Sequence, residues 1–411
     1  MYKDTLNISL FGDLWAIPDV TIKGELNSID LIIANLETPI INNINIKQSD
    51  KAGPVINGNI NDFENISNQL NNLCTVLANN HIMDYGEAGL NETLNALKKN
   101  NISYCGVGEN IYEAQKPLIL CIKNIKIAIV SVAEIQFGIA QYNKAGYNPF
   151  NANIYAQIIE LKKSCDIVII SIHASSEMSP IPSPDWQDTM RSLIDVGADI
   201  IHGHHSHVPQ GYEKYNQGII FYGLGNFIVN PDKWKQYKNT LWSLTPTIIY
   251  KDGEIKFEIK TSIIEKNDDK IIIRYANKKE VTAHFEYLKI CNSALSDRKL
   301  LIGLWQELSV KIYENHFGIW LGFIKLPSKI IKLTTRNKLG NIKRAIIELF
   351  FKQKQKLGVS KITKNEYLLW YHLFACQSHE KIIETALGIL GGEIADVRNK
   401  ETEEIISKYF Q

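Results

Sequence analysis

The sequence predicts an α/β protein in which a layered domain, with a mixed β-sheet or sandwich, is followed by a helical region. Two observations carry this prediction. Short apolar runs bounded by turn residues alternate with helical patterns through the first half, and consecutive strand-like runs follow them. After about residue 276, helical spacing and aromatic residues dominate. We therefore expect domains at residues 1–275 and 276–411, with the boundary in the polar stretch Lys266–Lys279.

The strand predictions rest on short runs rich in Ile, Leu and Val. They cover Asn7–Phe11, Asp30–Asn35, Thr75–Ala78, Pro117–Ile122, Lys126–Val132, Asp166–Ile172, Asp199–His202, Ile219–Tyr222, Leu241–Tyr250, Glu254–Ile263 and Lys270–Tyr275. Lys123 and Asn124 separate two of these runs and predict a hairpin turn.

Helices are expected where apolar residues recur with helical spacing. The candidates are Glu87–Lys99, Tyr155–Lys163, Trp186–Val196, Leu300–Tyr313, Asn341–Phe351, Glu366–Phe374 and Glu380–Leu390. The Asn-rich patches Ile41–Asn45 and Asn57–Asn71 are interpreted as compositional drift, with loops around Ala52–Asn59.

Composition excludes several classes of protein. A formal net charge of +1 argues against a nucleic-acid-binding protein, which usually carries a strong basic excess. The chain has no uninterrupted apolar run of about 18 residues and no signal-peptide pattern at its start, so we expect neither a membrane span nor export. The six cysteines lie far apart without a C-x-x-C pair, which favours buried free thiols in a reducing cytoplasm.

The histidines carry the strongest chemical signal. His81, His173 and a cluster at His202–His207 all lie at the ends of predicted strands, where α/β proteins commonly place their active sites. Asp13 and Glu37 occupy the same position after the first two strands. Five strand ends that each offer a ligand-type side chain predict a metal site.

Each of these segments also has an ordinary structural explanation. An Asp after Gly12 is most often a turn residue, and Glu37 taken alone could be an exposed acid, although Pro39 makes the chain leave the strand there. His173, with Glu177 four residues later, would be unremarkable in isolation.

The segment Asn79-Asn80-His81 places an amide oxygen beside an imidazole, which suits a metal ligand next to a proton donor. Asp84 is spaced to orient His81 through a ring N–H. The alternative is an Asn that caps a helix and a structural histidine.

The most specific element is Gly203–Val208, because a packed core rarely tolerates four histidines within six residues, His202 included. Alternate residues of an extended segment point the same way. We therefore expect His205 and His207 to reach neighbouring metal ions from one loop.

Taken in order, these motifs resemble the capsule-synthesis (CapA-type, poly-gamma-glutamate biosynthesis) branch of the calcineurin-like metallophosphoesterases. The resemblance covers about residues 5–230 and rests on Gly12-Asp13, Asn35-Leu36-Glu37, Asn79-Asn80-His81 with Asp84 and Gly86, Gly106-Val107-Gly108 with Glu113-Ala114, His173 with Glu177, Gly203–Val208 with Gln210-Gly211, and Tyr222–Phe227. It implies a four-layer calcineurin-like sandwich with a C-terminal helical extension.

The resemblance also implies two divalent metal ions between the facing sheets. Asp13 and His207 would hold one ion, and Glu37 would bridge to the other. A ligand set of nitrogen and oxygen atoms fits Mn²⁺, Fe²⁺ or Zn²⁺ better than Ca²⁺.

By the same resemblance, the second ion would be held by Asn80, His173 and His205. His81 would be the general acid, with Asp84 beside it. Three further residues of the matching motifs are candidates for contacting the substrate or supporting the ligands: His204, Glu177 and Asn226.

Two positions depart from the family's pattern. The wider superfamily has a His two residues after its first Asp, where this chain has Trp15, so we expect one ion to be held more weakly or by another ligand. The capsule branch usually has His-Trp-Gly where this chain has His173-Ala174-Ser175, which predicts a more open loop beside the metals.

Three functions remain open at this point. The first is a phosphomonoesterase or phosphodiesterase that acts on a phosphorylated glycan, glycolipid or nucleotide-sugar in capsule or exopolysaccharide biosynthesis. The second is a non-catalytic or weakly active accessory protein of polysaccharide or poly-gamma-glutamate capsule assembly. The third is a hydrolase of a non-phosphate bond such as an amide, which two-metal sites also cleave.

The helical region carries a basic stretch. Between Lys325 and Lys356 there are ten Lys or Arg residues and a single acid, Glu348. Such a stretch suits an anionic membrane face or a polyanionic glycan, and it would place a cytoplasmic protein peripherally on the inner face of the membrane. The alternative is the solvated face of a helical cap. The sequence leaves open whether these helices bind a partner or complete the core.

Overall fold

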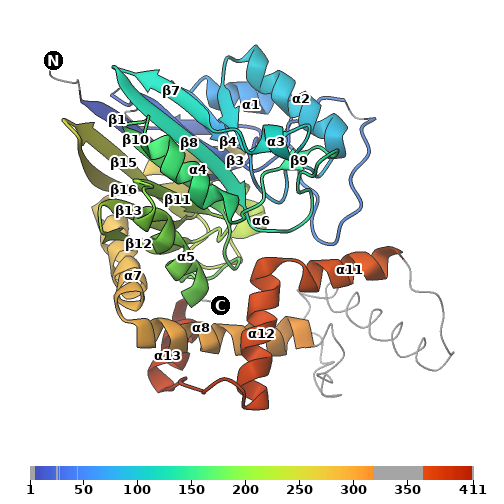
Figure 1. Cartoon of the computed structure of the whole chain (residues 1–411), viewed down its shortest axis with the longest axis vertical. Coiled ribbons are helices and arrows are strands. Elements are labelled where there is room, and N and C mark those ends of the chain that lie inside the picture. Colours follow the sequence, from blue (N-terminus) through green and yellow to red (C-terminus); the bar gives the residue numbers. More distant parts are fainter. Residues whose placement is uncertain (1–4, 25, 27, 44, 319–363, 410–411) are drawn as a thin grey trace.

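The computed structural model describes residues 5–318, apart from 25, 27 and 44, and residues 364–409. The basic stretch Lys325–Lys356 and the helix predicted at Asn341–Phe351 lie outside the described residues. Figure 1 shows two β-sheets with helices on their outer sides, and a group of C-terminal helices gathered at one end of the molecule.

The larger sheet comprises β1 (Leu6–Leu14), β2 (Val20–Lys23), β3 (Leu31–Leu36), β4 (Leu73–Val76), β5 (Ser103–Cys105), β14 (Asn226–Ile228), β15 (Trp242–Lys251), β16 (Glu254–Asn267) and β17 (Lys270–Tyr275). The strand order is β2-β17-β16-β15-β1-β3-β4-β5, and β14 pairs with β1. Strands β1, β3, β4 and β5 run parallel to one another, whereas β15 and β16 form an antiparallel pair.

The smaller sheet comprises β7 (Leu118–Ile122), β8 (Ile125–Ala133), β10 (Ile167–His173), β11 (Ile200–His204), β12 (Pro209–Tyr215) and β13 (Gly218–Leu224). Its order is β12-β13-β11-β10-β8-β7, with a parallel centre and an antiparallel strand at each edge. A separate short pair joins β6 (Val107–Gly108) to β9 (Gly146–Tyr147).

The two sheets pack face to face through alternate residues of their strands. On β1, Ile8 and Leu10 lie in the core between the sheets, and Phe11 lies on the opposite face. On β10, Ile169 faces the shared core and Ile170 faces away from it. This alternation follows from the two-residue period of a strand, and it gives both sheets two buried faces.

Helices cover the outer face of each sheet. Helices α1 (Ile60–Ser67) and α2 (Gly86–Lys99) contribute Phe63 and Leu90 to the core outside the larger sheet. Helices α4 (Asn153–Lys162) and α5 (Pro184–Asp195) contribute Ile158 and Leu193 to the core outside the smaller one. The short helices α3 (Ile111–Ala114) and α6 (Pro231–Trp234) lie in connections. The order of layers is therefore helix, sheet, sheet, helix, and the mixed α/β prediction is confirmed.

The C-terminal helices are α7 (Lys278–Ser296), α8 (Arg298–Ile312), a π-helical turn η1 (Tyr313–Phe317), α11 (Lys364–Phe374), α12 (Gln377–Gly391) and α13 (Lys400–Tyr409). Helix α7 inserts Tyr287, Leu288 and Cys291 into the core between the sheets. Helices α8, α11, α12 and α13 form a separate core around Trp305. The helical region is present as predicted, but α7 is shared with the sheets, and the division into two domains stays a prediction.

Most predicted elements are present, with ends shifted by a few residues. Lys123 and Asn124 have φ values of 52° and 59°, as the tight hairpin between β7 and β8 requires. No helix was predicted in the Asn-rich patch Asn57–Asn71, yet α1 lies inside it. The side chain of Asn59 accepts a hydrogen bond from the Asp62 amide and caps this helix. Only two residues of α1 are buried, Phe63 and Ile66, so the sequence shows too little helical periodicity to predict this helix.

Candidate metal centre

The carboxyl ends of four central strands meet at one place between the sheets. Asp13 lies near the end of β1, Glu37 directly follows β3, His173 ends β10 and His204 ends β11. Because β1 and β3 are parallel, as are β10 and β11, each pair delivers its side chains to the same edge of its sheet. All four side chains are fully buried.

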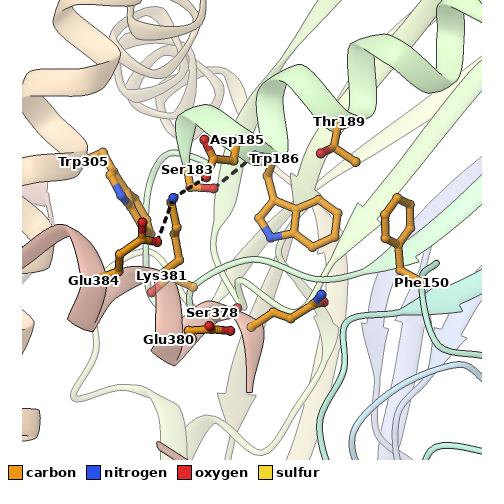
Figure 2. A pocket seen from close by; sticks show the side chains of 12 residues that line it. Phe150, Ser183, Asp185, Trp186, Thr189, Trp305, Ser378, Glu380, Lys381 and Glu384 are labelled. Atoms are coloured by element: carbon orange, nitrogen blue, oxygen red, sulfur yellow. Dashed lines mark hydrogen bonds and ion pairs between the residues drawn. The ribbon is translucent and has the colours of Figure 1, made fainter. Parts of the chain in front are cut away.

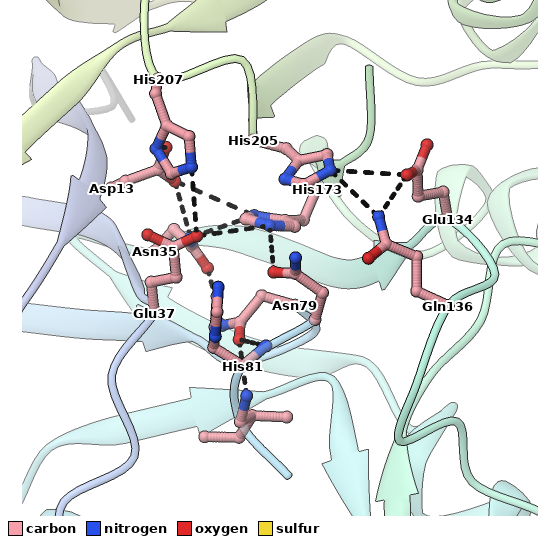
Figure 3. A network of polar contacts seen from close by, with 12 residues as sticks. Asp13, Asn35, Glu37, Asn79, His81, Glu134, Gln136, His173, His205 and His207 are labelled. Carbon is pink, nitrogen blue, oxygen red and sulfur yellow. Dashed lines mark hydrogen bonds and ion pairs between the residues drawn. The ribbon is translucent and has the colours of Figure 1, made fainter. Parts of the chain in front are cut away.

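Asp13, Glu37, His173 and His207 surround a common point, and Figure 3 shows their side chains converging on it. Asp13 Oδ2 lies 3.3 Å from His207 Nδ1. Glu37 Oε1 lies 3.8 Å from His207 Nε2 and 3.7 Å from His173 Nε2. One carboxylate oxygen of Glu37 therefore faces the imidazoles of two histidines, and its bridging role stays a prediction.

The candidate ligand atoms fall into two groups, in each of which the atoms lie within 4.8 Å of one another. They are Asp13 with His173 and His204, and Glu37 with His205 and His207. The structure thus brings His204, which the sequence suggests only as a supporting residue, into ligand range. Asn80 adjoins the first group, because its Oδ1 lies 3.1 Å from His173 Nε2. The division of ligands between two ions stays a prediction.

The polar atoms left without partners fit bound cations. Among the described residues, four buried atoms of this cluster have no hydrogen-bond partner: Asp13 Oδ2, Glu37 Oε1, His204 Nδ1 and His205 Nδ1. Leaving a buried acceptor unsatisfied costs about 1–3 kcal/mol, and more if it is charged. Divalent cations bound by these oxygens and imidazole nitrogens would satisfy all four at once, so the residues present fit the metals that the sequence predicts.

The pKa values of the buried acids and histidines in this cluster are shifted, some upward and some downward. Burial, followed by the charge of Asp13, raises the pKa of Glu37 to about 7. Burial opposes the charge of His207, but the nearby Glu37 and Asp13 carboxylates outweigh it and raise its pKa to about 10. Burial holds the pKa values of His173 and His204 well below the usual range, so both stay neutral with a lone pair free.

We expect metal binding to release protons, because a ligand must lose its proton before it can coordinate. At pH 8 the metal-free protein keeps a proton on His207, whose pKa is about 10. Titration of Mn²⁺ into weakly buffered, metal-free protein at pH 8, followed with a pH indicator dye, should release about one proton per chain. Saturable Mn²⁺ binding without proton release would show that His207 is not a ligand.

His81 and Asp84 lie at the side of the cluster. His81 Nδ1 lies 2.7 Å from Asp84 Oδ2, the contact expected from their spacing. The same oxygen accepts a hydrogen bond from the Ile56 amide at 2.8 Å. Lys51 Nζ lies 3.2 Å from the same Nδ1, so Asp84 and Lys51 both occupy this side of the ring and Nε2 faces away from them.

Sequence reasoning missed Lys51, whose ammonium group forms an ion pair with Asp84 and donates to the Asn80 carbonyl at 3.1 Å. Lys51 also lines a cavity of about 350 Å³ together with Asn80, Asp84, Phe137 and Lys144. Asp84, the partner of His81, is among the residues that line this cavity. A lysine in a polar loop gives no sequence signal of this kind.

Trp15 occupies the position at which the wider superfamily has a histidine. Its indole Nε1 donates a hydrogen bond to Glu37 Oε2 at 2.6 Å. Asn35 Nδ2 donates to Asp13 Oδ1 at 2.8 Å, and Asn79 Nδ2 in turn donates to Asn35 Oδ1 at 3.1 Å. Each carboxylate therefore has one oxygen held by a neighbour and the other directed to the centre.

The three remaining candidates have different surroundings. Asn226 Oδ1 accepts from His207 Nδ1 at 2.9 Å, and so orients that ring. His204 Nε2 lies 2.9 Å from Ser171 Oγ, which leaves Nδ1 toward the cluster. The side chain of Glu177 is exposed.

The loop that carries His205 and His207 is not extended. Both residues have positive φ, 86° and 56°, so the alternation argument used to place them was wrong. Their rings nevertheless reach the same cluster, because the turn between them folds back over it. Gly12 is required on the opposite side, since a Cβ at this position would lie 1.8 Å from the Gly225 carbonyl oxygen.

Sequence reasoning also missed Glu134, which directly follows β8. Its Oε1 lies 3.4 Å from His205 Nε2, and Gln136 Nε2 donates to the same oxygen. The signal was present, because Glu134 has the same position after a buried strand as Asp13 and Glu37.

Most of the segments that build this centre lie within the match to a known family. A family model described as "Bacterial capsule synthesis protein PGA_cap" matches residues 18–231, which is more than half of the chain. The chain belongs to this capsule synthesis family. The resemblance drawn from the motifs is thereby confirmed.

Three relatives to which this chain is similar are named for capsule, PGA or polyglutamine synthesis. The PGA biosynthesis protein CapA of Bacillus subtilis is 30% identical over 278 residues, which are 62% of this chain and 71% of that protein. The capsule biosynthesis protein CapA of Bacillus anthracis is 33% identical over 40% of this chain and 41% of its own length. A probable polyglutamine synthesis accessory protein of Mycobacterium tuberculosis is 32% identical over 37% of this chain and 44% of its own.

A solved structure of a hypothetical protein from Thermus thermophilus aligns with 62% of this chain and 98% of its own, at 11% identity and a TM-score of 0.39, too low to support an argument. In the part of this capsule-family chain that the structure describes, no helix has both the length and the apolarity to cross a membrane.

Proposed function

We propose that the chain is a metal-dependent phosphoesterase of calcineurin-like fold that acts on a phosphorylated glycan or glycolipid in capsule or exopolysaccharide biosynthesis. The observation that carries the proposal is the position of Glu37 Oε1, which has no hydrogen-bond partner in the described part of the chain and lies within 3.8 Å of imidazoles from β10 and from the loop after β11. The helix–sheet–sheet–helix layers and the family's capsule role support it.

In this proposal two cations, about 3.5–4 Å apart, would stabilise the charge on a phosphoryl group and lower the pKa of a bound water. Asp13, Glu37, Asn80, His173, His205 and His207 would hold them, with His204 Nδ1 also in range. Trp15 and Asn35 fix the rotamers of the two carboxylates through their outer oxygens.

The chain itself would supply the proton for the leaving group. Asp84 holds the Nδ1 side of His81, so the acid would be the imidazolium form, with the proton to be transferred on Nε2. Burial, followed by the charge of Lys51, lowers the pKa of His81, which makes this imidazolium a stronger acid. Lys51 neutralises part of the charge of Asp84 and keeps this carboxylate in place. The cavity beside Lys51 and Lys144 would receive the alcohol part of the ester.

The proposal is tested with metal-stripped protein, nitrophenyl phosphate and bis(nitrophenyl) phosphate. Hydrolysis of at least one ester should appear only after Mn²⁺, Fe²⁺ or Zn²⁺ is added. Glu160→Ala, which removes an exposed carboxylate on α4, should behave as the unchanged protein does. Metal binding without turnover of either ester would contradict a phosphoesterase.

That contrary outcome would favour the second candidate, a non-catalytic accessory protein of capsule assembly. The name of the mycobacterial relative, an accessory protein, motivates it. The third candidate, amide hydrolysis, is tested by adding γ-glutamyl amides to the same assay, since relatives are named for poly-gamma-glutamate biosynthesis. Amide turnover in the absence of ester turnover would decide for it.

We further propose that the basic stretch Lys325–Lys356 binds an anionic membrane face or polyanion and places the protein at the inner face of the membrane. Replacing Lys352, Lys354 and Lys356 with Gln should weaken sedimentation with phosphatidylserine-containing vesicles at low salt, where such attraction is strongest. The matched control replaces three exposed lysines of α7, Lys278, Lys279 and Lys289. Equal binding by both triple variants would contradict docking through this stretch.

A further inference from the structure

We propose that Glu134, held in place by Ser378 of helix α12, is a positioning residue that orients His205 toward the metal. A residue from the C-terminal helical region would thereby take part in building the metal centre. The inference rests on the proposed metal centre, but not on which bond the protein cleaves.

The first support is that the two ring nitrogens of His205 have different surroundings. Nε2 lies 3.4 Å from Glu134 Oε1 and 3.1 Å from Gln136 Nε2, an amide group that itself donates to Glu134 Oε1. Nδ1 is buried and has no hydrogen-bond partner among the described residues. Figure 3 shows the ring between Glu134 on one side and His173 and His207 on the other. The carboxylate favours a proton on Nε2, and this tautomer leaves the Nδ1 lone pair free to bind a metal.

The second support is that both oxygens of Glu134 are occupied. Gln136 Nε2 donates to Oε1, which also faces His205, and Ser378 Oγ donates to Oε2. The carboxylate is 1% exposed, so water cannot replace a lost donor easily. A buried carboxylate with partners on both oxygens is fixed in one orientation, and so is the ring beside it.

The third support is that three consecutive residues at the start of α12 form contacts with the segment that follows β8. Cys376 Sγ lies 3.5 Å from Glu134 Oε1. The side-chain oxygen of Gln377 accepts a hydrogen bond from the Ile135 backbone amide at 3.1 Å. The backbone amide of Gln377 donates to the Ile135 carbonyl oxygen at 3.4 Å. Ser378 Oγ also lies 2.9 Å from the Ser175 carbonyl oxygen, in the loop after β10. The start of the helix is therefore joined to two loops of the metal centre.

Helix α12 is itself anchored from its other side. It meets α5 and α8 around a cavity of about 300 Å³ that Ser378 lines, and Figure 2 shows Lys381 of α12 reaching Asp185 of α5. That ion pair measures 2.6 Å, and Trp305 of α8 donates to Thr385 of α12 at 3.1 Å. These contacts fix the position of α12, and with it the position of Ser378 beside Glu134.

The inference is tested on the full chain by Co²⁺ binding, measured as chelator competition and as the visible absorption of the bound ion. Glu134→Gln and Ser378→Ala should each weaken binding of one ion by about 10–100-fold and change the absorption spectrum, as expected for loss of an outer hydrogen-bonding partner. Ser378→Thr keeps the hydroxyl and should restore both. Thr385→Val, which removes a hydrogen bond of α12 far from Glu134, should leave the spectrum unchanged and so controls for loosened helix packing.

Glu134→Gln keeps the size of the side chain, so it gives an answer even if Ser378→Ala does not fold. Wild-type affinity and spectrum in Glu134→Gln and in folded Ser378→Ala would overturn the inference. Two bound ions without ester turnover in the unchanged protein would contradict only the phosphoesterase. Failure of the unchanged protein to bind Co²⁺ or Mn²⁺ would overturn both proposals.

Discussion

Glu37→Ala is expected to abolish metal-dependent hydrolysis and to lower the affinity for both ions. Glu37 Oε1 lies within 3.8 Å of His173 and His207, and a carboxylate in this position would serve both ions. The loss should exceed the roughly 10–100-fold effect typical of an outer hydrogen-bonding partner.

Two further variants make the Glu37 experiment specific. Trp15→Phe removes only the indole hydrogen bond to Glu37 Oε2, so a smaller loss of metal affinity is expected, within that 10–100-fold range. Glu160→Ala should retain unchanged affinity. Metal content and affinity are measured by mass spectrometry and chelator competition. Two ions bound by Glu37→Ala with unchanged affinity would show that Glu37 does not bridge them.

His81→Ala is expected to separate substrates by their leaving groups. A general acid contributes about 10²–10⁴-fold when the leaving group is poor, whereas an activated aryl oxide departs without a proton. The variant should therefore be slowed by that factor on an alkyl or sugar phosphate, and by much less on a nitrophenyl ester. Its metal content should stay normal, because His81 interacts with Asp84 rather than with the buried carboxylates of the cluster.

Asn80→Ala supplies the contrast for His81→Ala. Asn80 Oδ1 lies 3.1 Å from His173 Nε2, on the metal side of the same turn, so this variant should lose metal and slow on both substrates. Initial rates on the two ester classes, normalised to bound metal, decide between the roles. Equal slowing of both classes by His81→Ala, with metal content intact, would instead assign His81 to substrate positioning.

The residues of the centre that lie at strand ends could be predicted from the sequence, because parallel strands bring the side chains at their carboxyl ends to the same edge of a sheet. Asp13, Glu37 and His173 each lie at or just after the end of a strand recognisable from its apolar run. Parallel pairing brings Asp13 and Glu37 to one edge of the larger sheet, and His173 to one edge of the smaller sheet beside His204. The contact of His81 with Asp84 is similarly local, since three residues separate them.

What the sequence could not provide depends on distant contacts and on backbone conformation. Ser378 meets Glu134 across 244 positions of the chain, and no pattern near either residue records this pairing. The positive φ values of His205 and His207 lie in a region that non-glycine residues rarely adopt, so an extended loop was the ordinary expectation. Trp15 was recognised only as a missing ligand, and its hydrogen bond to Glu37 is visible only in three dimensions.

The question of what the C-terminal helices do is answered in part by their packing. Tyr287 and Leu288 of α7 lie in the core between the sheets, and Ser378 of α12 reaches the metal centre. Deleting the chain from about residue 290 would therefore remove Ser378 and expose part of Glu134. For this reason charge replacement in the basic stretch tests surface docking more cleanly than truncation does.

The central claim is that this cluster binds two metal ions, and anomalous diffraction from crystals of the Mn²⁺-loaded protein tests it most directly. The account predicts two peaks about 3.5–4 Å apart with Glu37 between them, flanked by His173 and His207. A map with no peak among these side chains at saturating Mn²⁺ would contradict it.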